Sequence, residues 1–88
     1  MTRGAYRVVG RVQGVGFRHF AARSARALGL AGGVRNEADG SVVAVAEGSD
    51  EALREFRRAL ERGPGASRVE RVEEIEGPFD DEDYDAAF

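Results

Sequence analysis

The sequence contains no cysteine and no lysine. Without cysteine the chain has no disulfide, no thiolate nucleophile and no cysteine metal ligand. Without lysine it has neither a Schiff-base amine nor the lysine of a nucleotide-triphosphate loop. Stability must therefore come from the core, and any chemistry must come from other side chains and from the backbone.

Long apolar runs and targeting patterns are also missing. The longest apolar run, Val42 to Ala46, is far too short to span a bilayer. The N-terminus has no charged-then-apolar secretory pattern. We therefore predict a cytoplasmic protein that does not bind membranes.

Length and charge bound the remaining possibilities. The 88 residues are enough for one small domain, which we place over residues 1–88. Hydrophobic residues make up 42% and charged residues 33%, which is typical of a globular chain. The net charge is −3, and this acidity argues against nucleic acid as a partner, because such binding depends on neutralising phosphates.

Hydrophobic periodicity predicts an alternating series of strands and helices. In chain order these are a strand over 5–12, a helix over 17–28, strands over 30–37 and 41–47, a helix over 50–62, a strand over 68–76 and a short strand over 84–88. This order predicts an α+β, ferredoxin-like two-layer sandwich, with an antiparallel sheet and both helices on one face.

Local signals refine these elements. Gly29 follows the first helix, and Ser49-Asp50 offers an N-cap for the second. In the strand over 68–76, valine and isoleucine recur every three positions rather than every two, so we expect a bulge, a bend or a strand shorter than this run.

The stretch from Gly10 to Arg18, Gly-Arg-Val-Gln-Gly-Val-Gly-Phe-Arg, joins the first strand to the first helix. Glycine allows positive φ and lets consecutive N–H groups point into one concavity. A helix that begins at such a turn adds free N–H groups and the positive end of its dipole. An arginine adds a planar fork of donors for phosphate or carboxylate. The stretch predicts an anion cradle, and a plain turn with a solvated Arg18 is the alternative.

Spacing excludes several known phosphate-binding loops. A triphosphate loop needs Gly-Lys-Ser/Thr, where this chain has Gly16-Phe17-Arg18. A dinucleotide fingerprint needs a third glycine at the position of His19, and a cysteine phosphatase loop needs its nucleophile at Val12. An anion cradle without its own nucleophile remains.

The same stretch resembles the first signature of the acylphosphatases. Other segments match that family in residues and spacing: Gly33–Asn36, Asp39–Val42, Glu47–Gly48, Gly63–Pro64 and Ala66–Val69. The resemblance covers nearly the whole chain. It implies the ferredoxin-like fold and the hydrolysis of acyl phosphates to a carboxylate and phosphate, with no metal and no cofactor.

The resemblance also implies roles for individual residues. Arg18 and the loop N–H groups would bind the phosphoryl group; the loop residues are Gln13, Gly14, Val15, Gly16 and Phe17. Asn36 would hold and orient the attacking water. Glu37 should point to the opposite face of its strand, so the substrate's own phosphate is our hypothesis for the proton acceptor. The expected partner is a small-molecule acyl phosphate, bound by a monomer whose loop can also hold phosphate or sulfate.

Other conspicuous residues receive structural interpretations. We expect His19 to be exposed and non-catalytic, and Phe17, Phe20 and Phe56 to lie in the core. The acidic run over 80–83 is interpreted as a solvated tail.

The sequence also departs from the family at two places. Gly33 stands where the family often has an aromatic residue, and the segment over 84–88 lacks the isoleucine and arginine with which the family commonly ends. The second departure puts the packing of the last strand in question.

A non-catalytic ferredoxin-like module that binds RNA or a small anion is the alternative function. An RNA-binding sheet needs exposed aromatic residues on its central strands. Valines occupy those strands instead: Val8, Val9, Val43 and Val45. A third possibility is that the chain is related to larger hydrogenase-maturation carbamoyltransferases, which resemble acylphosphatases at their amino-terminal end. This chain, however, has the length of one domain.

Overall fold

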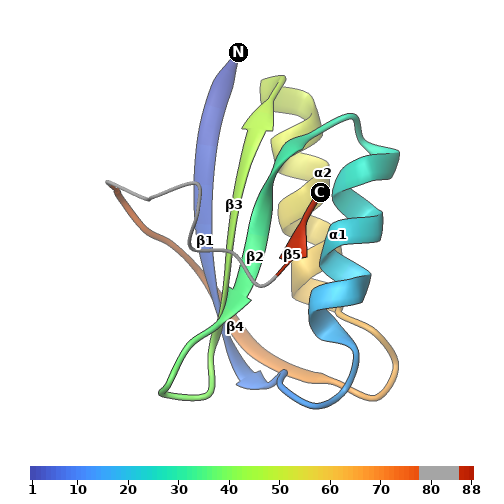
Figure 1. Cartoon of the computed structure of the whole chain (residues 1–88), viewed down its shortest axis with the longest axis vertical. Helices are drawn as coiled ribbons and strands as arrows, with labels where there is room; N and C mark the ends of the chain where they lie inside the picture. Colours follow the sequence, from blue (N-terminus) through green and yellow to red (C-terminus); the bar gives the residue numbers. More distant parts are fainter. Residues whose placement is uncertain (78–85) are drawn as a thin grey trace.

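The computed structural model describes residues 1–77 and 86–88 and has two layers, a sheet and a pair of helices (Figure 1). The elements are β1 (Thr2–Arg11), α1 (Phe17–Ala27), β2 (Ala31–Asn36), β3 (Val42–Gly48), α2 (Asp50–Arg62), β4 (Arg68–Glu74) and β5 (Ala86–Ala87). The strands form one sheet in the order β4-β1-β3-β2-β5, and every neighbouring pair is antiparallel. Both helices cover one face of the sheet. The predicted ferredoxin-like architecture is confirmed.

The main core lies between the helices and the sheet. Phe17 of α1 and Phe56 and Leu60 of α2 are almost completely buried against Val8 and Val34 of the central strands. A smaller apolar cluster of Ala5, Val43 and Val45, with Ile75 packed against it, lies on the other face of the sheet. Valine and alanine therefore fill both sides of the sheet's centre, and among the described residues that second cluster contains no aromatic side chain.

The predicted helix ends are confirmed. Ser49 caps α2, because its hydroxyl accepts a hydrogen bond of 3.1 Å from the amide of Ala52. Asp50 and Glu51 occupy the first turn of α2, where their negative charges interact favourably with the positive end of the helix dipole. Gly29 follows α1 with φ of 72°, a conformation that favours glycine.

The strands differ from the sequence prediction mainly at their ends. β1 begins at Thr2, three residues earlier than predicted, because pairing with β3 continues to Thr2 opposite Gly48. The predicted bulge is present: the register between β1 and β4 shifts between Val9 and Gly10. β4 is also shorter than the run over 68–76, as one of the alternatives predicted, and ends at Glu74.

The prediction that Phe20 lies in the core is wrong. The buried residues of α1 are Phe17, Ala21, Ala22 and Ala25. At about 100° per residue, Phe20 falls at the margin of this stripe. It is therefore half-buried rather than in the core, with its ring centroid 5.9 Å from that of Phe17.

The last strand packs at the edge of the sheet even though the family's usual ending is missing. Residues 86 and 87 pair with Val34 and Gly33 of β2. The ring of Phe88 lies 5.7 Å from that of Phe56, and Arg26 of α1 donates a hydrogen bond of 3.1 Å to the carbonyl of Ala87. Tyr84 and the acidic run over 80–83 lie outside the described residues. Among the residues that are described, no helix is long and apolar enough to cross a membrane.

Candidate active site

The loop between β1 and α1 turns on two glycines. Gly14 has φ of 74° and Gly16 has φ of 79°, both in the left-handed region that glycine tolerates best. No heavy atom lies within 4 Å of where a Cβ would stand on either residue. The loop is therefore open beside both glycines, as expected of a cradle. Val12 and Phe17, each 1% exposed, anchor its two ends in the core.

The first turn of α1 is an unusual helix start. Its first intrahelical hydrogen bond runs from the amide of Phe20 to the carbonyl of Gly16, at 3.0 Å. Within the described ranges 1–77 and 86–88 no side chain caps this helix, and its first turn contains no acidic residue. Arg18, which is exposed, lies in that turn. The helix thus begins with amide donors, the positive end of its dipole and a guanidinium, whereas α2 begins with a serine cap and two carboxylates.

Asn36 is the last residue of β2 and pairs with Val42 of β3. Because side chains alternate along a strand, it lies on the same face as the buried Val34, which is the face that the helices cover. The residue is half-buried, and its side-chain oxygen is buried. The carboxamide is therefore held within the fold at the end of the sheet to which the loop belongs.

Gln13 joins the loop to the hairpin that carries Asn36. Its side-chain amide donates to the backbone carbonyls of Glu37, at 2.7 Å, and Ser41, at 2.9 Å. These contacts cross 24 and 28 residues of sequence. The sequence predicts only a backbone role for Gln13, and no local signal reveals this side-chain link, because it depends on how β1, β2 and β3 align.

Glu37 is turned away from Asn36, as predicted. Its carboxylate forms an ion pair of 3.2 Å with Arg35, two residues earlier and on the opposite strand face from Asn36. Both side chains are partly buried, at 22% and 28% exposure. Glu37 is thus held by its partner and does not stand beside Asn36 as a base. His19, the only histidine, is exposed, as predicted.

The turn of the β2–β3 hairpin is closed by Asp39 and Ser41. The carboxylate of Asp39 accepts hydrogen bonds from the amide of Ser41, at 2.9 Å, and from its hydroxyl, at 2.6 Å. These bonds, with Arg7 at 3.1 Å, hold the pKa of Asp39 below its ordinary value, the hydroxyl bond having the largest effect. The hairpin that presents Asn36 is therefore fixed at its tip as well as by Gln13.

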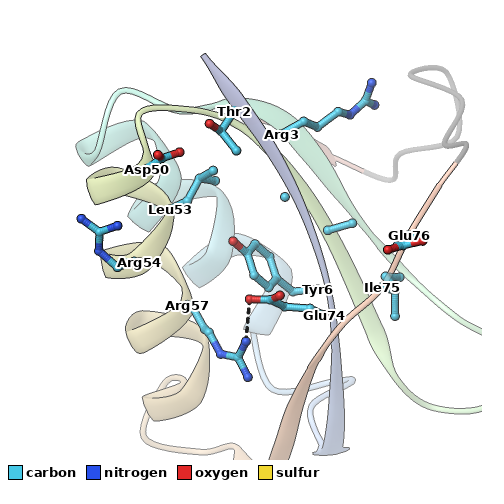
Figure 2. A pocket seen from close by; sticks show the side chains of 12 residues that line it. Thr2, Arg3, Tyr6, Asp50, Leu53, Arg54, Arg57, Glu74, Ile75 and Glu76 are labelled. Atoms are coloured by element: carbon cyan, nitrogen blue, oxygen red, sulfur yellow. Dashed lines mark hydrogen bonds and ion pairs between the residues drawn. The ribbon is translucent and has the colours of Figure 1, made fainter.

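A large hollow lies far from these residues. It has a volume of about 570 Å³ and is lined by the first half of β1, by α2 and by the end of β4 (Figure 2). The hydroxyl of Tyr6 points into it, beside an ion pair of 2.8 Å between Arg57 and Glu74. Since the loop follows the last residue of β1, the hollow and the predicted site are at opposite ends of that strand.

Comparison with known proteins agrees with the fold. The profile of the acylphosphatase family matches residues 4–87. An acylphosphatase from Nitratidesulfovibrio vulgaris is 51% identical over 78 residues, which are 89% of this chain and 78% of that protein. The crystal structure of acylphosphatase from Bacillus subtilis superposes with a TM-score of 0.83 and 41% identity, covering 85% of this chain and 83% of that one.

The fold also occurs as part of a larger protein. Full-length HypF, solved in a phosphate- and nucleotide-bound form, matches with a TM-score of 0.74 and 28% identity. That match covers 96% of this chain but only 11% of HypF.

The two-layer fold and the family match identify a hydrolase of acid anhydrides. The chain belongs to the acylphosphatase family, which confirms the resemblance seen in its sequence. Its activity is accordingly the hydrolysis of acyl phosphates, and its substrate is a small molecule of that class.

Proposed function

We propose that the chain hydrolyses acyl phosphates by direct attack of a water molecule on the phosphoryl group. In this proposal, Arg18 and the amides of residues 13–18 hold the phosphoryl group, and Asn36 orients the water. The observation that carries the proposal is the first turn of α1, which no described side chain caps and which has no acidic residue. Gln13 links the loop before this turn to the hairpin of Asn36.

The loop and Arg18 suit the charge of the transition state. Phosphoryl transfer passes through a metaphosphate-like state whose charge lies on three equatorial oxygens. Amide dipoles and a guanidinium fixed around those oxygens stabilise that charge without reorganising during the reaction. The positive φ of Gly14 and Gly16 turns the backbone so that several N–H groups can face one point.

Asn36 suits the other side of the reaction. A carboxamide accepts and donates hydrogen bonds but is too weak a base to take a proton from water. The water oxygen forms the new bond to phosphorus, and the bond between phosphorus and the acyl oxygen breaks. The carboxylate leaves with the electron pair and needs no general acid, because the pKa of its conjugate acid is roughly 4. The water's proton passes to a phosphate oxygen, since Glu37 is paired with Arg35 on the other strand face.

The direct test is phosphate release from benzoyl phosphate or acetyl phosphate in the presence of a chelator. Asn36→Ala should lower kcat by about 100-fold or more while the inhibition constant of inorganic phosphate changes little. Arg18→Ala should both lower kcat and weaken phosphate binding, by a combined loss of about 100-fold or more. Arg23→Ala, which removes another exposed arginine of α1, is the matched control and should keep full activity.

Three outcomes would contradict this proposal. Wild-type protein that releases phosphate no faster than buffer would rule out the activity. Loss of turnover on adding chelator would rule out a metal-free mechanism. Equal losses in Arg18→Ala and Arg23→Ala would show that only general positive charge matters.

We also propose a monomer in the cytoplasm whose loop binds phosphate or sulfate as well as substrate. A monomer suffices because every proposed site residue comes from the loop, the first turn of α1 or the end of β2 in the same chain. Light scattering at catalytic concentrations tests the oligomeric state, and titration with phosphate and sulfate tests the binding of each ion.

A further inference from the structure

The side chain of Gln13 occupies a position between the two halves of the proposed site. It leaves the loop directly before Gly14, and its Nε2 atom lies 2.7 Å from the carbonyl oxygen of Glu37 and 2.9 Å from that of Ser41. A carboxamide nitrogen carries two hydrogens, so each carbonyl can receive one. The side chain is partly buried, where water competes less for these bonds than at the surface.

The two carbonyls belong to Glu37 and Ser41, the two residues that close the β2–β3 hairpin. The amide of Glu37 donates to the carbonyl of Ser41 at 2.8 Å, so both ends of the turn are already joined to each other. The side-chain amide of Gln13 donates a further hydrogen bond to the carbonyl of each of these residues. Because Glu37 follows Asn36 directly in sequence, its carbonyl belongs to the backbone that sets where the Asn36 side chain stands.

We propose that Gln13 is a positioning residue that sets the distance and angle between the loop and Asn36. This inference rests on the proposed function, in which the loop holds the phosphoryl group and Asn36 holds the water. In-line attack needs the water oxygen at about 3–3.5 Å from phosphorus and opposite the leaving oxygen, and a displacement of 1 Å can cost about 100-fold in rate. One carboxamide that belongs to the loop and donates to the hairpin fixes this geometry before substrate arrives.

The central test is the variant Gln13→Met, which keeps the length of the side chain and removes both donors. We expect kcat to fall by roughly 10- to 100-fold. The loop amides and Arg18 are unaltered, so KM and the inhibition constant of phosphate should change by less than about threefold. Such a split between kcat and KM is the signature of a misplaced water rather than of a lost phosphate contact.

A double-mutant cycle with Asn36→Ala separates positioning from a general structural effect. If Gln13 acts through Asn36, then Gln13→Met should lower kcat little further once the Asn36 side chain is gone. A purely structural role would give multiplicative losses instead. Ser49→Ala removes the cap of α2 at the far end of the molecule, so it should lower the melting temperature and leave kcat unchanged.

Gln13→Glu provides a second variant in case the methionine variant does not fold. It keeps the shape of the side chain but directs a carboxylate at two carbonyl oxygens, so at neutral pH it should lose at least as much kcat as Gln13→Met. The inference is overturned if a folded Gln13 variant keeps kcat within twofold of wild type, or if its loss multiplies with that of Asn36→Ala. A wild-type protein without phosphatase activity would instead refute the proposed function itself, and the role of Gln13 with it.

Discussion

Gly10 of β1 lies so close to Arg68 of β4 that a Cβ on the glycine would overlap the carbonyl oxygen of Arg68. The same Cβ would stand 2.8 Å from the amide nitrogen of Glu70. This close approach occurs where the register between the two strands shifts. With φ of 140°, Gly10 also has a backbone conformation that side chains rarely adopt. The first glycine of the loop signature is thus required by the sheet.

Gly10→Ala should therefore destabilise the protein strongly. Backbone strain of this kind costs about 1–3 kcal/mol, and the overlap with two backbone atoms adds to it. Urea unfolding measures the loss. Gly65→Ala is the matched control: nothing lies within 4 Å of its Cβ position, and it should change the unfolding free energy by less than about 0.5 kcal/mol. Similar losses in both variants would contradict this account.

Gly16→Ala should weaken phosphate binding as well as stability. The residue has φ of 79° with open space around it, so the cost is the left-handed conformation alone, about 1–2 kcal/mol. If the backbone relaxes to avoid this strain, the amides at the start of α1 change direction.

Gly29→Ala is the control for that variant. Gly29 has φ of 72° and open space too, but lies at the other end of α1. Calorimetry with phosphate should show weaker binding for Gly16→Ala only, while both variants unfold more readily. Equal phosphate affinity in the two variants would argue against the loop as the anion site.

The hairpin turn should weaken in acid through Asp39. Hydrogen bonds from Ser41, with a contribution from Arg7, lower the pKa of this carboxyl below 3.8. A lowered pKa means that the stabilisation is complete above 3.8 and is lost as the pH falls through the pKa of the folded state. The difference in stability between wild type and Asp39→Asn should therefore shrink as the pH falls below 3.8. Urea unfolding between pH 6 and pH 2 measures it, and a constant difference would contradict the prediction.

Tyr6 should make the fold sensitive to alkali. Burial of this residue, which is 5% exposed, raises the pKa of its phenol above 10.0; Glu74 adds to the shift and Arg57 opposes it. Because the folded-state pKa is raised, the stabilisation is complete below 10.0 and is lost as the pH rises through the folded-state pKa. Tyr6→Phe should therefore lose less stability than wild type between pH 8 and pH 11, measured by urea unfolding. Parallel curves would show that Tyr6 does not titrate in this way.

Local sequence signals predict most of the elements, and the strand end that they miss depends on pairing with another strand. Serine at 49 and glycine at 29 mark helix ends by their own conformational preferences, so they are visible without a structure. The bulge in β4 could be predicted from the spacing of its apolar residues, whereas the early start of β1 at Thr2 could not. Its polar first residues are held in the strand by pairing with β3 rather than by their own propensity.

The candidate site likewise has residues that the sequence predicts and a contact that it does not. Arg18 and Asn36 are visible because they belong to signatures with fixed spacing. The link from Gln13 to Glu37 and Ser41 is not visible, because it joins residues 24 and 28 positions apart through three aligned strands. Side-chain bonds that cross elements depend on register, and register is a property of the whole sheet.

The missing cap of α1 has a consequence for the energetics of folding. Among the described residues, no side chain caps the start of α1, and its first turn contains no acidic residue. In the proposed mechanism an anion binds at this turn, and a ligand that binds only the folded chain stabilises it. At 100 times its dissociation constant, inorganic phosphate would raise the unfolding free energy by about 2.7 kcal/mol. The product of the reaction would thus stabilise the fold of the enzyme that releases it.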